Sequence, residues 1–192
     1  MSTTTEAKPK FRAAVLNLPN QLTIARVVLS IGLFVAVALG WYKVAFTAFV
    51  LAASTDWLDG YFARKYGMVT VLGRILDPFA DKLIICGTYI FLATIDDSGI
   101  TAAMAVIVMG RELLVTALRS FLESSGTDFS ADMSGKVKMV LQCLAAGMSL
   151  YFLAFRPAWP ATLLLATSWA AVAATIYSGV VYIRRAVTIY DQ

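Results

Sequence analysis

Six apolar stretches of about 20 residues, separated by short polar connections, constrain this chain more than any other feature. Crossing the hydrocarbon core of a bilayer takes about 20 apolar residues in a helix. Hydrophobic residues make up 59% of the chain and charged residues only 15%, whereas an ordinary soluble domain is about 25% charged. We therefore expect one all-α integral membrane domain over residues 1–192 with six transmembrane helices, at roughly Leu22–Gly40, Val44–Phe62, Ile75–Ile95, Ile100–Leu122, Val137–Phe155 and Ala161–Ile183.

The basic residues predict the orientation of these spans. An even number of spans places both termini on one side, and of the 16 lysines and arginines all but Lys43 and Arg156 fall on that side. This bias predicts cytoplasmic termini and a charge that favours anionic lipid headgroups, with no nucleic-acid partner. Residues 1–19 should form a cytoplasmic or interfacial segment, since apolar and basic residues are mixed ahead of Pro19 as in a short amphipathic helix on the membrane surface.

The chain contains no histidine. This excludes Ser-His-Asp catalysis, phosphohistidine intermediates and histidine-ligated zinc or haem. Acid–base chemistry, if present, must use Asp, Glu, Lys, Tyr or Cys.

Four aspartates lie at fixed spacing at the facing ends of the second and third expected spans. They form the pattern Asp56-x2-Asp59-Gly60-x2-Ala63-Arg64-x8-Gly73-x3-Asp77-x3-Asp81. A carboxylate at membrane depth costs about 2.5–3.5 kcal/mol, so four of them need compensating positive charge. Spacings of three and four put each pair on one helix face, and the ten residues between Arg64 and Ile75 allow the two helices to run antiparallel.

Oxygen ligands of this kind favour Mg²⁺, Mn²⁺ or Ca²⁺ over softer metals. Four carboxylates exceed what one Mg²⁺ takes, so two ions are expected, an arrangement suited to phosphoryl transfer. Gly60 and Gly73, and more weakly Ala63, remove side chains where a ligand would pass close to the backbone, and Arg64 could bind a phosphate with two hydrogen bonds. The alternative is salt bridging of the aspartates to Arg64, Arg74 and Lys82, which leaves the two glycines unexplained.

A second set of charges predicts a pocket for an anion. Arg111 lies deep in the fourth expected span, where a charge is costly without a partner. Arg119, eight residues later, shares its helix face, and Lys136 opens the fifth span from the same side. Together they would suit an acceptor that carries its own phosphate. The alternative is ordinary cytoplasmic surface charge, which we favour for Lys138.

The aspartate pattern resembles the signature of the CDP-alcohol phosphatidyltransferases at every motif position. The resemblance implies transfer of a phosphatidyl group from CDP-diacylglycerol to an alcohol with release of CMP, catalysed by a homodimer that binds two Mg²⁺ or Mn²⁺ ions. It implies that Asp56, Asp59, Asp77 and Asp81 hold the metals and that Asp81 is also the general base. The positions that it implies for binding CDP-diacylglycerol are Asn20, Thr23, Gly60, Ala63, Arg64, Thr70 and Gly73, of which the first two belong to an Asn20-x2-Thr23-x2-Arg26 segment.

The pairs Arg111-Glu112 and Leu118-Arg119 and the segment Gly135-Lys136-x-Lys138 are similar to the phosphatidylglycerophosphate synthase branch of this family. That branch implies sn-glycerol 3-phosphate as the acceptor, bound through its phosphate by Arg111, Arg119 and Lys136. It also implies a bacterial inner (cytoplasmic) membrane protein whose active site opens to the cytoplasm. The alternatives are an inositol phosphate acceptor, phosphatidylglycerol as in cardiolipin synthases, and, from other classes, a cation transporter or a purely structural membrane protein.

Overall fold

The computed structural model describes residues 18–66, 71–124, 133–158 and 161–190, and these residues form helices and short connections without a strand. The helices are α2 (Leu18–Ala38), α3 (Tyr42–Tyr66), α4 (Val71–Leu92), α5 (Ala102–Ser124), α6 (Met133–Phe155) and α7 (Ala161–Tyr190), with a short 3-10 helix, η1 (Asp96–Ser98), between α4 and α5.

Each of the six apolar stretches corresponds to one long helix, so the all-α prediction is confirmed for the described residues. Among the described residues, three segments are both long and apolar enough to cross a membrane by length and composition: Gln21–Ala38, Met133–Phe155 and Ala161–Ile189. The expected ten-residue turn after Arg64 was wrong. The helix α3 continues to Tyr66 and α4 begins at Val71, because the polar residues of the aspartate motif are themselves helical.

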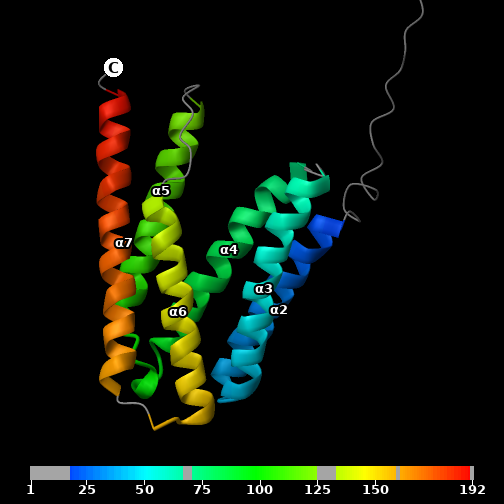
Figure 1. The fold of residues 1–192 in the computed structure, drawn as a ribbon, viewed down its shortest axis with the longest axis vertical. Coiled ribbons are helices and arrows are strands. Elements are labelled where there is room, and N and C mark those ends of the chain that lie inside the picture. Colours follow the sequence, from blue (N-terminus) through cyan, green and yellow to red (C-terminus); the bar gives the residue numbers. More distant parts are fainter. Residues whose placement is uncertain (1–17, 67–70, 125–132, 159–160, 191–192) are drawn as a thin grey trace, which may run out of the picture.

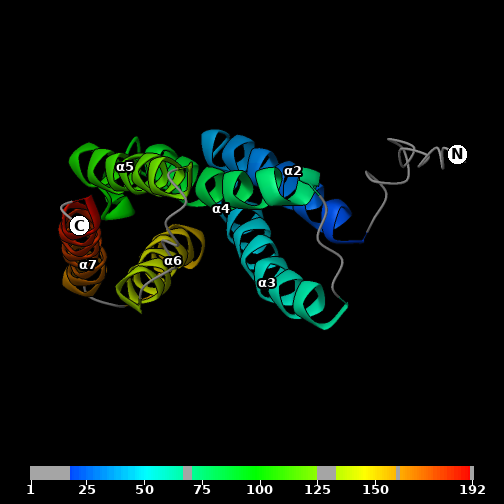
Figure 2. The ribbon, with the colours of Figure 1, turned by 90° about the horizontal axis from the view of Figure 1, so that it is seen from above.

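The helix α4 lies obliquely at the centre of the molecule (Figure 1). It packs against α2 on one side and against α5 and α6 on the other. The helix α3 also packs against α6. Seen from above, α2 and α3 form one group while α5, α6 and α7 form a second group across α4 (Figure 2). Side chains at the meeting point of the two groups therefore come from segments far apart in the sequence.

The distribution of polarity differs from that in a soluble protein at both the surface and the interior, although most buried residues are apolar. Large apolar side chains such as Val28, Val106, Val140 and Tyr177 are more than 60% exposed. The buried positions include the polar residues Thr23, Arg26, Ser30, Thr88, Arg111, Glu112, Lys138, Gln142, Thr175 and Ser178. Large apolar side chains exposed in this number favour contact with lipid or a partner. The buried polar side chains bond either to one another or to the backbone of their own helix, as Ser30 and Thr88 do.

Two glycines fix the packing of α2. Gly40 follows the helix with a φ of 73°, and the Trp41 and Gly40 amides donate to the carbonyls of Ala36 and Val37 at 2.8 and 3.0 Å, the usual glycine-terminated helix end. Gly87 on α4 faces Phe34, where an added Cβ would lie 2.1 Å from the ring. The absence of a side chain there lets α2 and α4 approach closely.

Candidate active site

Asp81, the last aspartate of the motif, lies on α4. Its carboxylate forms an ion pair that the spacing of the sequence does not predict. Its Oδ1 accepts a hydrogen bond from Nη1 of Arg26 on α2 at 2.6 Å, and Arg26 is only 2% exposed. The neighbouring Lys82 instead donates to the carbonyl of Pro78 at 3.3 Å. The pairing of Asp81 with Lys82, considered as an alternative, is therefore not what the structure contains.

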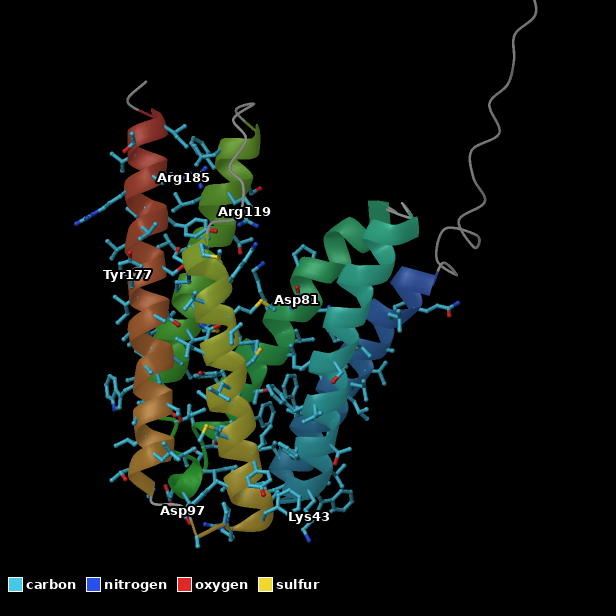
Figure 3. The ribbon with its side chains drawn as sticks, viewed as in Figure 1. Lys43, Asp81, Asp97, Arg119, Tyr177 and Arg185 are labelled. Atoms are coloured by element: carbon cyan, nitrogen blue, oxygen red, sulfur yellow. The ribbon has the colours of Figure 1, made fainter. Side chains whose placement is uncertain are left out.

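Asp81 opens onto a cavity of about 350 Å³ between α4, α5, α6 and α7. Two carboxylates, those of Asp81 and Glu112, line this cavity. The cationic side chains that line it are more numerous: Lys82, Arg111, Arg119, Lys136 and Lys138. Asp81, Arg119 and the α5–α7 group can be followed in Figure 3. The three residues predicted to bind an acceptor phosphate, Arg111, Arg119 and Lys136, thus line one cavity together with Asp81.

Glu112 is the centre of a buried polar network in the wall of this cavity. Its Oε1 accepts hydrogen bonds from Nζ of Lys138 and, at 3.2 Å, from Nη1 of Arg111. Lys138 also lies 3.4 Å from Oε1 of Gln142, whose amide donates to the Thr175 hydroxyl at 2.8 Å. The network ties α5 to α6 and α7, and one carboxylate compensates two buried cations.

Arg111 is further oriented by α7. Its Nη2 donates to the Ser178 hydroxyl at 2.6 Å, its guanidinium carbon lies 5.2 Å from the centre of the Tyr182 ring, and its aliphatic stem passes 3.4 Å from where a Cβ of Gly179 would be. A guanidinium held on an aromatic face and by a hydroxyl keeps a fixed direction. Its Nε, which is buried, has no hydrogen-bond partner among the described residues.

Arg119 and Lys136 contrast with this arrangement. Neither forms a hydrogen bond or ion pair with any residue that the structure describes, and both line the cavity. Their donors are therefore available to an anionic ligand.

A smaller, mostly apolar cavity of about 40 Å³ lies on the other side of Asp81. Its wall is formed by Phe49, Ala52, Ala53, Ile84, Ile85, Met139 and Cys143, with Arg26 and Asp81 at its polar edge. Asp81 therefore stands between a cationic cavity and an apolar one.

The remaining predicted residues are only partly described. The backbone places Asp56, Asp59, Gly60, Ala63 and Arg64 on α3, Gly73 and Asp77 on α4, and Asn20 on α2. Their side chains, and Thr70 altogether, lie outside the described residues, whereas Thr23 is buried on α2. Within the described part of the chain no three Asp, Glu, Cys or His side chains gather as metal ligands.

Sequence reasoning missed three charged residues of this site: Arg26, Glu112 and Lys138. The assignment of Lys138 to surface charge was wrong, since it is 7% exposed and paired with Glu112. A usable signal existed, because Arg26 and Lys138 both fall inside expected spans, where an ionisable residue is a functional candidate by default.

Comparison with known proteins identifies the family. The family model for CDP-alcohol phosphatidyltransferase matches residues 16–180. The chain is 38% identical over 182 residues to a CDP-diacylglycerol–glycerol-3-phosphate 3-phosphatidyltransferase of Bacillus subtilis, covering 85% of this chain and 91% of that protein. It is 38% identical over 136 residues to the Rickettsia felis protein of the same name, covering 67% and 72%. A probable phosphatidylglycerophosphate synthase of Mycobacterium tuberculosis is 34% identical over 181 residues, covering 91% and 84%. With a site built around the last aspartate of the family signature and a match over most of its length, the chain belongs to the CDP-alcohol phosphatidyltransferase family.

Proposed function

We propose that this protein transfers the phosphatidyl group of CDP-diacylglycerol to sn-glycerol 3-phosphate, forming phosphatidylglycerol phosphate and CMP. The observation that carries the proposal is the cavity in which Asp81 faces Arg111, Arg119 and Lys136. A carboxylate beside three cations, two of which have no partner among the described residues, suits an acceptor that has both a hydroxyl to activate and a phosphate to bind. The names of the bacterial relatives point to the same pair of substrates.

In the proposed reaction the primary hydroxyl of glycerol 3-phosphate attacks the phosphorus that bears the diacylglycerol. The new phosphorus–oxygen bond forms as the bond to the bridging diphosphate oxygen breaks, and CMP leaves with that oxygen. Asp81 accepts the hydroxyl proton as general base, a role that contributes typically 10²–10⁴-fold to rate. Arg26 fixes the position of the Asp81 carboxylate through the 2.6 Å ion pair.

The donor set of the motif fits a hard divalent metal, since it consists of carboxylates at spacings of three and four on two consecutive helices. Asp56, Asp59, Asp77 and Asp81 would hold two Mg²⁺ or Mn²⁺ ions, which would neutralise the diphosphate and make CMP a better leaving group. Asn20, Thr23, Gly60, Ala63, Arg64, Thr70 and Gly73 are the proposed contacts to CDP-diacylglycerol.

The acceptor phosphate would bind the donors of Arg119 and Lys136, which no described residue occupies, and the oriented guanidinium of Arg111. Charge-assisted hydrogen bonds to phosphate are roughly twice as strong as neutral ones. Because Arg111 is already held by Ser178 and Tyr182, little side-chain entropy is lost when the acceptor arrives.

We also propose that all six helices span the bacterial inner membrane, with both termini and the active site on the cytoplasmic side, and that the protein is a homodimer. The shortest helix, α2, has 21 residues, which is about 30 Å at 1.5 Å per residue. Lys43 and Asp97 lie at one end of the bundle, while Arg119 and Arg185 lie toward the other (Figure 3). That separation supports the orientation inferred from the basic residues.

An acceptor screen tests this function. Purified protein in detergent, given CDP-diacylglycerol and Mg²⁺ or Mn²⁺, should release CMP with glycerol 3-phosphate and not with serine, inositol phosphate or phosphatidylglycerol. Release only with another alcohol would keep the reaction class but overturn the acceptor, and no release with any acceptor would overturn the proposed activity.

A further inference from the structure

The two oxygens of the Glu112 carboxylate have different surroundings. Both of its contacts, to Lys138 and to Arg111, use Oε1. Oε2 bonds to no described residue, and it is not among the fully buried polar atoms without a partner. Since Glu112 lines the 350 Å³ cavity and its Oε1 is already occupied, Oε2 is the oxygen left to accept a hydrogen bond from a ligand in that cavity.

Charge compensation of Arg111 and Lys138 explains the contacts of Oε1 but gives Oε2 no partner among the described residues. The cavity is otherwise dominated by donors, because Lys82, Arg119, Lys136 and Lys138 line it as well. A carboxylate accepts hydrogen bonds and donates none, so it repels the oxygens of a phosphate. A ligand that satisfies both kinds of group must carry a phosphate for the cations and a hydroxyl for Oε2.

We propose that Glu112 is a specificity-determining residue whose Oε2 accepts a hydrogen bond from the hydroxyl of the acceptor that does not react. This inference rests on the proposed function, in which the acceptor is glycerol 3-phosphate. That molecule has a primary hydroxyl, which attacks, and a secondary hydroxyl, which is left over. Asp81 on α4 and Glu112 on α5 line the same cavity, so each hydroxyl has its own carboxylate.

The position of Glu112 is also well suited to discrimination between acceptors. Its Oε1 is fixed by two cations from α5 and α6, and Arg111 is fixed in turn by Ser178 on α7. Because contacts from α5, α6 and α7 hold this carboxylate, its Oε2 cannot shift to make another contact with a ligand that lacks the hydroxyl. A hydrogen bond to a charged group contributes enough to change affinity about 10- to 100-fold.

The test compares two acceptors, glycerol 3-phosphate and 3-hydroxypropyl phosphate, which keeps the phosphate and the primary hydroxyl but lacks the secondary hydroxyl. The measured quantity is the ratio of their kcat/KM values for CMP release within one protein sample, so that the folded fraction cancels. We expect the wild type to favour glycerol 3-phosphate by about 10- to 100-fold. The ratio should fall clearly toward one in Glu112→Gln/Lys138→Met, which removes the carboxylate and one cation together, because a neutral amide bonds a hydroxyl less strongly than a carboxylate does.

Two further variants separate this role from a structural one. Glu112→Asp keeps the negative charge beside Lys138 and Arg111 but withdraws Oε2 by one methylene, and it should lower the ratio part of the way. Lys136→Ala is the matched control: both acceptors carry the phosphate, so both KM values should rise and the ratio should stay as in the wild type. Isothermal titration of both acceptors gives the binding ratio for any variant with too little turnover.

The outcomes are distinguishable. A wild-type ratio near one, or a ratio that the Glu112 variants leave unchanged, would overturn the role of Glu112 while leaving the proposed function intact. Absence of CMP release with glycerol 3-phosphate in the wild type would overturn the proposed function and this inference with it. A large wild-type ratio that collapses in the Glu112 variants but not in Lys136→Ala supports the inference.

Discussion

The buried cluster of Arg111, Glu112 and Lys138 makes a strong prediction about stability. One negative charge compensates two positive charges there, and all three residues are at least nine-tenths buried. Glu112→Gln changes the net charge of the cluster from +1 to +2. Removing one partner of a buried ion pair costs about 3–5 kcal/mol, because the remaining charge stays buried and uncompensated.

Lys138→Met should cost less, since Arg111 still bonds to Glu112 and the cluster becomes neutral. The double variant Glu112→Gln/Lys138→Met returns the net charge to +1. It should therefore be more stable than the sum of the single losses predicts, by a coupling of about 1–3 kcal/mol.

The measurement is thermal unfolding in detergent, followed by the fluorescence of the four tryptophans. For a protein of this size 1 kcal/mol corresponds to about 2–4 °C, so Glu112→Gln should lower the midpoint by roughly 6–20 °C. The exposed Lys136→Met, two residues from Lys138, is the control and should leave the midpoint unchanged. A Glu112→Gln midpoint equal to that of the wild type, or strictly additive losses in the double variant, would refute the electrostatic reasoning.

Three further predictions concern the reaction. Asp81→Asn should lower the rate of CMP release by at least about 10²-fold while binding of CDP-diacylglycerol, measured by titration, is largely kept; wild-type turnover would remove Asp81 as the base. Arg119→Ala should raise the KM for glycerol 3-phosphate by about 10-fold or more and leave the KM for CDP-diacylglycerol nearly unchanged, and equal effects on both substrates would place the acceptor phosphate elsewhere. Removal of divalent ions with EDTA should abolish CMP release, and added Mg²⁺ or Mn²⁺ should restore it; activity that persists without divalent ions would contradict a metal held by the four aspartates.

The helices could be predicted from the sequence because each one corresponds to an uninterrupted run of mainly apolar residues. Runs such as Val137–Phe155 have a length and polarity that only a buried or lipid-facing helix satisfies. The grouping of Arg111 and Arg119 was predictable for the same reason, since a spacing of eight residues defines one helix face. Both side chains line one cavity in the structure.

The partners within the site were not predictable in this way. Arg26 and Asp81 are 55 residues apart, and Lys138 and Glu112 are 26 apart, so their pairing depends on which helices meet. Even the contact between the adjacent residues Arg111 and Glu112 does not follow from spacing, because neighbours on a helix point about 100° apart. The long guanidinium stem nevertheless turns back to reach the carboxylate. Local spacing identifies candidate residues, and tertiary packing decides their contacts.

The position of α4 between the two helix groups divides the chain into two halves with separate tasks. The aspartate motif and Arg26 belong to α2, α3 and α4, whereas Glu112, Arg119, Lys136 and Lys138 belong to α5 and α6. In the proposed reaction the first half binds the activated lipid and supplies the base, Asp81, whereas the second half supplies most of the charged residues that bind the alcohol. A change of alcohol could therefore arise mainly from residues after α4, and we expect a chimaera joined at the connection after α4, around η1, to follow its C-terminal parent in its choice of alcohol.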